Sequence, residues 1–171
     1  MSMDSVLIRS IAVLVLMTST LCSYADAKQH TKLKFYMHDN TAPPNVTVVQ
    51  VARPSANVSS TFFGTVVVID DLITEGPSPS SKVLGRGQGT YIFDSMNTVS
   101  LLLTFTAVFE NDVHNGTLSF HGADPILQKK REIAVVGGTG VFRYARGYAI
   151  IETHTFTYAT TVLLFDVTLR R

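Results

Sequence analysis

Apolar and polar residues alternate with a period of two over long stretches of this chain. The clearest example is the segment 101–110, in which one face carries only apolar side chains: Leu101, Leu103, Phe105, Ala107 and Phe109. Residues 148–156 and 161–169 alternate in the same way. Because this period places successive side chains on opposite faces of an extended backbone, all three segments are predicted to be β-strands.

Further strands are expected wherever Val, Ile, Thr, Phe and Tyr gather between Gly, Pro, Asn, Asp and Ser. These conditions are met at 33–39, 46–52, 62–69, 83–93, 116–121 and 132–136. The aspartates at 70, 71 and 94 follow such segments and are interpreted as turn residues. No segment keeps a helical period, and only a short helical turn is expected at 141–146.

Eight or nine short strands predict an all-β fold, either a barrel or a sandwich. Several of these strands are apolar on both faces. One face can fill a barrel interior, whereas the other needs cover, which favours a subunit interface. Assembly would also protect exposed strand edges.

The first 27 residues have the pattern of a secretory signal peptide. Arg9 precedes a short apolar run at 11–17, and residues 25–27 match an A-x-A cleavage site. The apolar run is too short to span a bilayer, although an uncleaved anchor is the alternative interpretation. The chain is therefore expected to be secreted, with no membrane segment after cleavage and a single domain at 28–171.

Cysteine content and charge exclude several kinds of chemistry. The single cysteine, Cys22, lies inside the predicted signal peptide, so the mature domain has no disulfide and no thiolate nucleophile or ligand. Removing residues 1–27 takes away one arginine and two aspartates, which changes the net charge from +1 to about +2. Since no basic stripe is present, neither nucleic acid nor an anionic membrane is expected as a partner.

Three N-x-S/T sequences lie beside turn residues, and they begin at Asn45, Asn57 and Asn115. In a secreted chain each is a glycan acceptor where it is exposed. The sequence therefore predicts a glycoprotein.

Two aspartates at the ends of strand-like segments are the first candidates for chemistry. Asp39 ends the segment 33–39, and Asp124 follows the segment 116–121. If both face one apolar cavity, burial raises the pKa of each carboxyl group and lets it exchange protons near neutral pH. Aspartate is also common at strand ends for turn reasons alone, so that alternative stays open.

Three further residues are candidates for binding. Arg131 precedes the strand 132–136, where it would pair a carboxylate or a phenolate oxygen, or else lie at a rim as a surface cation. Tyr91 and Phe93 share one face of the segment 83–93, where they would line an aromatic pocket or pack in the core.

Two other patterns are too weak to indicate a cofactor or a metal. Residues 137–140 (G-G-T-G) imitate a dinucleotide loop, but no amphipathic helix follows, and a glycine-rich bend is the better interpretation. His38, His121 and His154 fall in strand segments without any H-x-H pair. Neither a cofactor nor a metal site is therefore expected.

Several blocks resemble the plant dirigent family in their order and spacing. They are Phe35 to Asp39, Phe63-Gly64 with Asp70-Asp71, Gly85 to Gly89, Gly122 to Pro125, and Gly137 to Gly147. Together the blocks extend over nearly all of the predicted mature domain, from Leu33 to about Thr168.

The resemblance implies an eight-stranded antiparallel β-barrel that is secreted into the plant apoplast and forms a homo-oligomer, a trimer or a dimer. It also implies phenolic radical substrates, for example from coniferyl alcohol, supplied by a separate laccase or peroxidase. Such proteins need no cofactor and impose stereoselective coupling that gives optically active lignans. The chain itself is then expected to have no independent activity, or to be a lyase or cyclase if it is an enzyme.

The resemblance also carries over roles for individual residues. It implies that Asp39 and Asp124 are the acids that assist closure of a bis-quinone methide, with Arg131 assisting the charge. Tyr91 matches a pocket tyrosine, whereas Phe93 replaces a second one. The chain also lacks the cystine of pinoresinol-forming members and has a shorter segment after Asp39, so the identity of the phenol stays open.

Two other functions are compatible with these residues. Some relatives dehydrate isoflavanols to pterocarpans through a quinone methide, which is a lyase reaction that needs no oxidant. The segment Gly122 to Pro125 is expected to differ in that branch, which favours coupling. A non-catalytic barrel for hydrophobic ligands or cell-wall sugars is the third hypothesis, although the absence of tryptophan argues against a sugar platform.

Overall fold

The computed structural model describes residues 30–55 and 60–170, which form nine β-strands and one 3₁₀ helix. The elements are β1 (His30–Asn40), β2 (Val48–Ala52), β3 (Val66–Thr74), β4 (Val83–Phe93), β5 (Leu101–Glu110), β6 (Asn115–Asp124), β7 (Lys130–Gly138), η1 (Gly140–Phe142), β8 (Arg146–Phe156) and β9 (Thr160–Arg170). The predicted signal peptide at 1–27, with Cys22, lies outside the described residues. No helix in this described part is long and apolar enough to cross a membrane.

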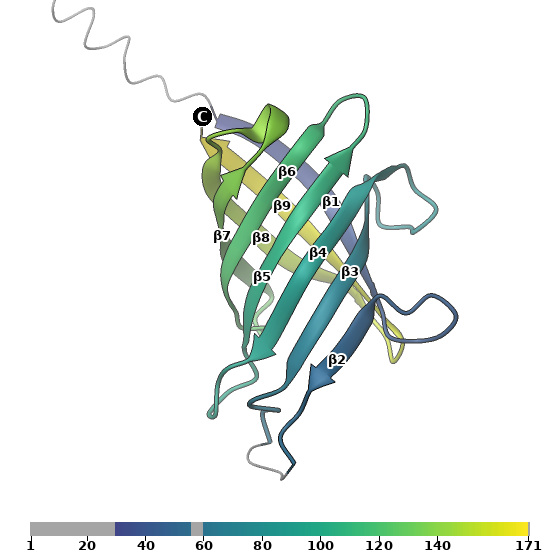
Figure 1. Ribbon diagram of the computed structural model, residues 1–171, viewed down its shortest axis with the longest axis vertical. Coiled ribbons are helices and arrows are strands. Elements are labelled where there is room, and N and C mark those ends of the chain that lie inside the picture. The colour runs from purple at the N-terminus through teal and green to yellow at the C-terminus, as the bar shows by residue number, and fades with distance from the viewer. Residues whose placement is uncertain (1–29, 56–59, 171) are drawn as a thin grey trace, which may run out of the picture. The chain divides into compact units, whose positions relative to one another are not determined.

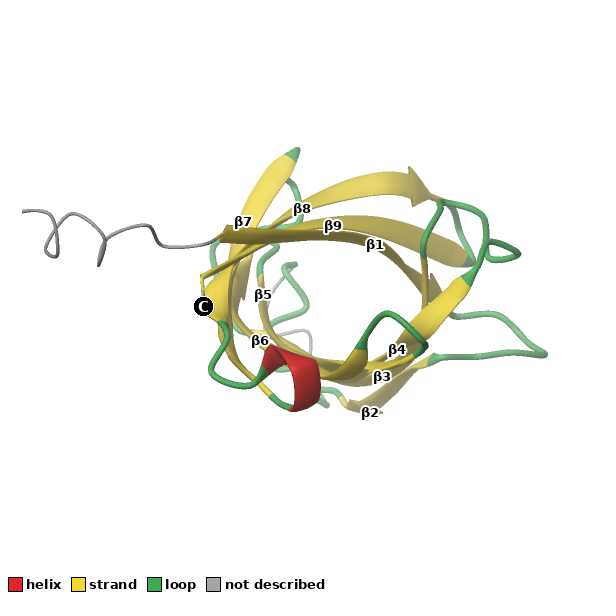
Figure 2. Cartoon of the chain, turned by 90° about the horizontal axis from the view of Figure 1, so that it is seen from above, coloured by secondary structure: helices red, strands yellow, loops and turns green. Residues whose placement is uncertain are grey.

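Eight of the strands close into an antiparallel barrel (Figures 1 and 2). The sheet runs in the order β1-β9-β8-β7-β6-β5-β4-β3-β2, and β1 also pairs with β3, which closes the ring. The ninth strand, β2, lies on the same edge of β3 as β1. The first part of β3, at 66–69, pairs with β2, and the last part of β3, at 72–74, pairs with β1. The predicted all-β, eight-stranded antiparallel barrel is therefore confirmed, and assembly into oligomers stays a prediction.

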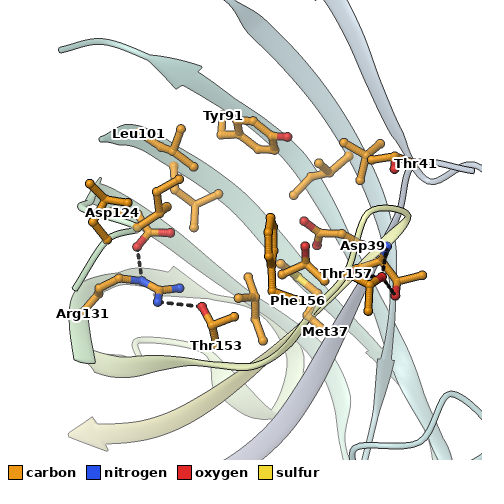
Figure 3. Close-up of a pocket in the computed structure, with 18 of the residues that line it drawn as sticks. Met37, Asp39, Thr41, Tyr91, Leu101, Asp124, Arg131, Thr153, Phe156 and Thr157 are labelled. Carbon is orange, nitrogen blue, oxygen red and sulfur yellow. Dashed lines mark hydrogen bonds and ion pairs between the residues drawn. The ribbon is translucent and has the colours of Figure 1, made fainter. Parts of the chain in front are cut away.

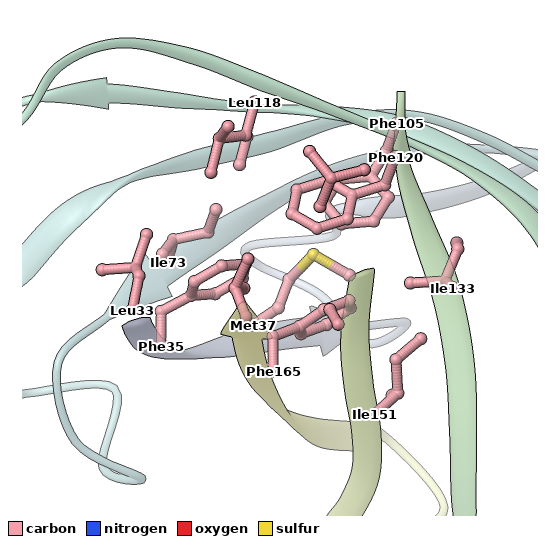
Figure 4. Close-up of a cluster of buried hydrophobic side chains, with 14 of the residues drawn as sticks. Leu33, Phe35, Met37, Ile73, Phe105, Leu118, Phe120, Ile133, Ile151 and Phe165 are labelled. Atoms are coloured by element: carbon pink, nitrogen blue, oxygen red, sulfur yellow. The ribbon is translucent and has the colours of Figure 1, made fainter. Parts of the chain in front are cut away.

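One end of the barrel is filled by aromatic side chains (Figure 4). The rings of Phe35 and Phe165 stack with centroids 5.0 Å apart, and those of Phe105 and Phe120 stack at 4.6 Å. These residues occupy inward positions of β1, β5, β6 and β9, because alternate residues of each strand point into the barrel. The apolar face predicted for 101–110 is buried throughout.

The 3₁₀ helix η1 covers this packed end. Phe142 is buried against Phe109, with ring centroids 5.5 Å apart. Gly140 has a φ of +59°, and a Cβ atom there would lie 2.3 Å from the carbonyl oxygen of Asn115. The glycine-rich bend expected at 137–140 holds only at Gly140, because Gly137 and Gly138 lie in β7 without positive φ values. The helical turn expected at 141–146 is a shorter 3₁₀ turn that begins one residue earlier.

The strand predicted at 62–69 is displaced, because β3 begins at Val66 and continues to Thr74. Phe62 and Gly64 have positive φ values, which are incompatible with a strand. The turn predicted at Asp70 and Asp71 is wrong, since both residues lie inside β3 and pair with Gln88 and Gly87 of β4. Pairing with β4 along the whole of β3 outweighs the turn preference of aspartate.

Candidate functional site

A cavity of about 790 Å³ occupies the other end of the barrel, where β4, β6 and β8 end. Most of its wall is aliphatic or aromatic, with Met37, Val48, Ile69, Leu101, Leu103 and Leu163 among the lining residues. All five residues singled out from the sequence for catalysis or binding also line it: Asp39, Asp124, Arg131, Tyr91 and Phe93. The barrel therefore brings together side chains from β1, β4, β6 and β7, and their roles stay predictions.

Asp124 and Arg131 form a buried ion pair on one side of the cavity (Figure 3). The Arg131 Nε–H donates to Asp124 Oδ1 at 2.5 Å. Arg131 is only 3% exposed and Asp124 only 2%. The guanidinium group also donates to the hydroxyl of Thr153 at 3.0 Å and to the carbonyl oxygen of Gln128 at 3.3 Å. Burial raises the pKa of Asp124, and the charge and hydrogen bond of Arg131 oppose this rise.

The local sequence explains why these two residues meet. Asp124 is the last residue of β6, and Arg131 is the second residue of β7, the next strand in the sheet. The loop between them turns through a hydrogen bond from the Gln128 N–H to the carbonyl oxygen of Pro125. The short connection holds both side chains at one end of the barrel.

Asp39 points into the cavity from the other side in Figure 3, and it has a partner that sequence reasoning missed. β1 and β3 pair Met37 with Ile73, and continuing this antiparallel register brings Asp39 opposite Asp71. Asp71 is completely buried, and the two carboxyl groups interact with each other. The cavity thus has an acidic pair on this side rather than the single aspartate expected.

Burial is the main cause that raises the pKa values of both carboxyl groups in this pair. The pKa of Asp39 rises to about 6; the hydrogen bond with Asp71 opposes the rise, and the charge of Asp124 adds to it. The pKa of Asp71 rises to about 9, because the charge of Asp39 adds to burial more than the hydrogen bond from Thr47 opposes it. The pair therefore retains a proton at neutral pH.

The sequence does contain a signal for Asp71. The inward positions of β3 are Val67, Ile69, Asp71 and Ile73, so the alternation continues through the aspartate. On β4, Gly87 lies opposite Asp71, and a Cβ atom there would lie 2.6 Å from Met37 Sδ. Because Gly87 has no side chain, Met37 can lie beside the acidic pair.

Tyr91 and Phe93 form the aromatic part of the cavity wall. Their rings meet edge to face, with centroids 5.9 Å apart. Burial, and then the charges of Asp39 and Asp71, raise the pKa of Tyr91 to about 12. The phenol of Tyr91 is consequently a hydrogen-bond donor at neutral pH, whereas Phe93 offers only an apolar surface.

The hairpin between β8 and β9 forms another wall that the sequence did not indicate. Phe156 and Tyr158 line the cavity although Phe156 is 79% exposed and Tyr158 is fully exposed. The backbone N–H and the hydroxyl of Thr41 both donate to the carbonyl oxygen of Ala159, at 2.9 and 3.1 Å. The hairpin is thereby tied to the segment that follows β1, beside Asp39.

Other candidates lie outside the cavity. Asn45 and Asn115 are exposed, and Asn57 lies outside the described residues. Within residues 30–55 and 60–170, no three His, Cys, Asp or Glu side chains gather as a metal site would require. The three strand histidines therefore do not form one.

An antiparallel barrel with an apolar, ligand-sized cavity and buried acids defines a class of small-molecule binding barrels. Residues 30–170 match the model of the Dirigent-like protein family, and the chain belongs to that family. Dirigent protein 11 of Arabidopsis thaliana is 41% identical over 139 residues, which cover 80% of this chain and 72% of that protein.

Two pterocarpan synthases are also similar to this chain. Pterocarpan synthase 1 of Glycine max is 36% identical over 156 residues, covering 88% of this chain and 83% of that protein. The solved structure of the pterocarpan synthase dirigent protein PsPTS1 superposes with a TM-score of 0.77 at 36% identity, covering 84% of this chain and 96% of that one. Members of this family thus include proteins named as synthases.

Proposed function

We propose that this protein binds phenoxy radicals of phenylpropanoid type, made by a separate laccase or peroxidase, and directs their coupling to optically active lignans or related dimers. The observation that carries the proposal is the presence of two buried acidic groups on different sides of one apolar cavity, Asp39 with Asp71 and Asp124 with Arg131. Family membership supports it. Secretion, glycosylation at the three sequons and assembly into a homo-oligomer belong to the same proposal.

Positioning is the first step of this mechanism. Each oxidised phenol has lost one electron and one proton to the oxidase, and the two radicals pair their odd electrons in a new carbon–carbon bond. The aromatic wall of Tyr91, Phe93 and Phe156 holds the rings face to face or edge to face, which selects one relative orientation.

Proton transfer is the second step. The coupled product is a bis-quinone methide, and a side-chain hydroxyl group adds to each methide carbon while the quinone oxygen gains a proton. Acids buried in an apolar cavity suit this transfer, because their pKa values lie closer to neutral pH than those of exposed aspartates. Asp39 and Asp124 are the proposed acids, and Arg131 stabilises negative charge beside Asp124.

A lyase reaction is the second candidate. In it, a phenolic alcohol would lose its phenol proton and a protonated hydroxyl group as water, and the resulting quinone methide would close on a second hydroxyl group. The proton retained by the Asp39–Asp71 pair favours this reaction, since loss of a hydroxyl group needs an acid. The similarity to pterocarpan synthases supports it as well.

One experiment separates these functions. The purified protein is incubated with monolignols and with isoflavanols, each with and without a one-electron oxidant, and the products are resolved by chiral chromatography. Coupling predicts an enantiomeric excess only with the oxidant, and the lyase predicts product without it. Racemic products from every phenol, with none formed in the absence of oxidant, would exclude both.

Matched variants then assign the acids. Asp39→Asn and Asp124→Asn are each expected to abolish the enantiomeric excess or the dehydration, while Asp70→Asn, on the outer surface of β3, leaves both unchanged. If wild type binds phenols but forms no product, and binding is the same in both pocket variants, the non-catalytic barrel is the correct alternative.

A further inference from the structure

We propose that Asp71 donates a hydrogen bond from its protonated Oδ2 atom to Asp39 Oδ1. In this arrangement Asp39 meets the substrate, and Asp71 is the positioning residue that carries the proton of the pair. The role of Asp39 toward a substrate rests on the proposed function. The location of the proton between the two carboxyl groups does not, and it can be measured on the protein alone.

The burial of the two groups is the first observation. Asp71 is fully buried and does not line the cavity, whereas Asp39 does. Asp39 Oδ1 and Asp71 Oδ2 are both inaccessible to water, and neither accepts a hydrogen bond from any N–H or hydroxyl group of the described chain. If both carboxyl groups were ionised, these two buried oxygens would repel each other with no donor to compensate, so one of the groups is inferred to carry a proton.

Thr47 determines which oxygen of Asp71 holds that proton. The backbone N–H of Asn40 donates to Thr47 Oγ1 at 2.9 Å, and the Thr47 hydroxyl lies 2.5 Å from Asp71 Oδ1. Asp71 Oδ1 is the hydroxyl's remaining partner in the described structure, so the hydroxyl donates and Oδ1 accepts. The proton of Asp71 is therefore on Oδ2, the atom left without a donor.

The backbone fixes this arrangement. The Thr47 N–H donates to the carbonyl oxygen of Asn40 at 2.8 Å, and the Asp70 N–H donates to the carbonyl oxygen of Thr47 at 2.9 Å. The loop between β1 and β2 is thus fastened to both β1 and β3 at the position of Thr47. A hydroxyl group held in this way has little freedom to reverse its hydrogen bond.

The charged groups around the pair are consistent with this assignment. Asp39 interacts with Asp71 and with the more distant Asp124, and Tyr91 interacts with both members of the pair. Arg86, which points outward from β4 to Asp70, is the cation that acts on Asp71. Burial and the mutual repulsion of the carboxyl groups raise the pKa of Asp71 to about 9, above that of Asp39 at about 6, as expected for a donor and its acceptor.

The two sides of the cavity consequently differ in chemistry. Asp124 accepts its hydrogen bond from Arg131, which never gives up its proton, whereas Asp39 accepts from a carboxyl group that can. At neutral pH the proton on Asp71 Oδ2 reaches the substrate through Asp39, which takes it up and passes it on, and Asp71 is left ionised. Both acids face the substrate, but only Asp39 has a second carboxyl proton beside it. A leaving hydroxyl group, or the first quinone oxygen to gain a proton, is therefore expected on the Asp39 side of the cavity.

Titration of the carboxyl groups by ¹³C NMR tests the proton's location without a substrate. In the full-length protein, the carboxyl groups of Asp39 and Asp71 should titrate well above the usual range for aspartate. Each resonance is assigned by its absence from the spectrum of Asp39→Asn or of Asp71→Asn. Asp39→Asn removes the charge that opposes ionisation of Asp71, so the titration of Asp71 should move to lower pH. An unchanged titration of Asp71, or titration of both groups with the exposed aspartates, would overturn the proposal.

Two variants at position 71 test the donor itself. The amide introduced by Asp71→Asn is uncharged and can still donate to Asp39, like the protonated carboxyl group, so the titration of Asp39 should stay close to that in wild type. Asp71→Leu has nearly the same shape but no donor, so Asp39 should titrate at higher pH. Equal titrations of Asp39 in these two variants would contradict the hydrogen bond.

Thr47→Val provides a further variant of nearly the same shape. It removes the donor to Oδ1, so the titration of Asp71 should move to still higher pH, and Thr47→Ser should restore it. Because Thr47→Val also removes the sequon of Asn45, Asn45→Gln is the control and should leave both titrations unchanged. A shift in Asn45→Gln equal to that of Thr47→Val would contradict the role of the hydroxyl group.

A pH profile of the reaction connects the pair to function. Asp71→Asn should keep the rate within about threefold at pH values below about 6, where Asp39 holds its own proton. Its rate should fall at higher pH, where only wild type retains a proton in the pair, up to a pH of about 9. An equal loss at every pH would indicate a purely structural role. If the NMR titrations behave as expected but no phenol is converted, the proposed function fails while the carboxyl pair stands.

Discussion

The two ends of the barrel are built on the same strands but from different side chains. At one end, inward positions carry phenylalanines that stack in pairs and fill the interior. At the other, inward positions carry aliphatic residues, aromatic rings and buried acids around a cavity of about 790 Å³. The end filled with phenylalanines stabilises the fold, and this stability lets the cavity end hold buried acids, which by themselves destabilise a protein interior.

Single strands show how sharply this change occurs. Along the inward face of β1, Phe35 and Met37 are followed directly by Asp39. On β6, Leu118 and Phe120 precede Asp124 on the same inward face. The period of two is kept, and only the chemistry of the inward residue changes, so each strand contributes to both ends.

The largest difference expected between the two ends is in stability. Phe120→Ala removes a fully buried ring that contacts Phe35, Phe105 and Phe165, and should lower the free energy of unfolding by about 3–5 kcal/mol. Phe93→Ala at the cavity should cost clearly less, because Phe93 is only half-buried. Urea denaturation measures both, and equal losses would contradict the division into a packed end and an open end.

A second large effect is expected inside the cavity itself. Arg131→Met leaves Asp124 buried without its partner and should cost about 3 kcal/mol. The double variant Asp124→Leu with Arg131→Met replaces both charges by apolar groups, so most of the stability should return. Denaturation of wild type and these variants measures the difference, and a double variant as unstable as Arg131→Met would show that the ion pair itself stabilises the barrel.

Much of the barrel could be predicted from the sequence, because alternation over 101–110 or 83–93 is a local signal. The cavity residues Asp39 and Asp124 could be predicted as candidates for a related reason, since each interrupts an apolar strand at its end. Asp71 could not, because its role depends on β1 pairing with β3 across the closure of the barrel. Phe156 was missed because nothing local distinguishes an exposed aromatic residue over a cavity from one in solvent.

The third prediction concerns the cavity end alone and the way in which its stability depends on pH. The pKa of Asp71 is higher in the folded than in the unfolded state, so the folded state holds a proton that the unfolded state releases, and the fold loses stability as the pH rises toward about 9. Asp71→Asn lacks this proton. As the pH rises from about 6 to about 8, its free energy of unfolding should therefore increase by about 2–3 kcal/mol relative to that of wild type. Urea midpoints at several pH values measure the difference.

The control for this prediction is Asp70→Asn, whose side chain points outward to Arg86. Its stability relative to wild type should stay constant over the same pH range. His38, which is buried near Thr74 and has a lowered pKa, contributes equally to all three proteins and therefore cancels in the comparison. A difference between Asp71→Asn and wild type that does not change with pH would mean that Asp71 is ionised in the folded protein.

The smallest effect on stability is expected at the hairpin over the cavity. Phe156→Ala removes an exposed ring, so the free energy of unfolding should change by less than about 0.5 kcal/mol. Because the ring also lines the cavity, binding of a phenol should weaken by about two- to tenfold, the range of a single aromatic contact. Val113→Ala is the matched control, since Val113 is also apolar and exposed but lies in the β5–β6 loop at the packed end. Calorimetric titration should show weaker binding in Phe156→Ala alone, and equal affinities in both variants would remove the hairpin from the binding site.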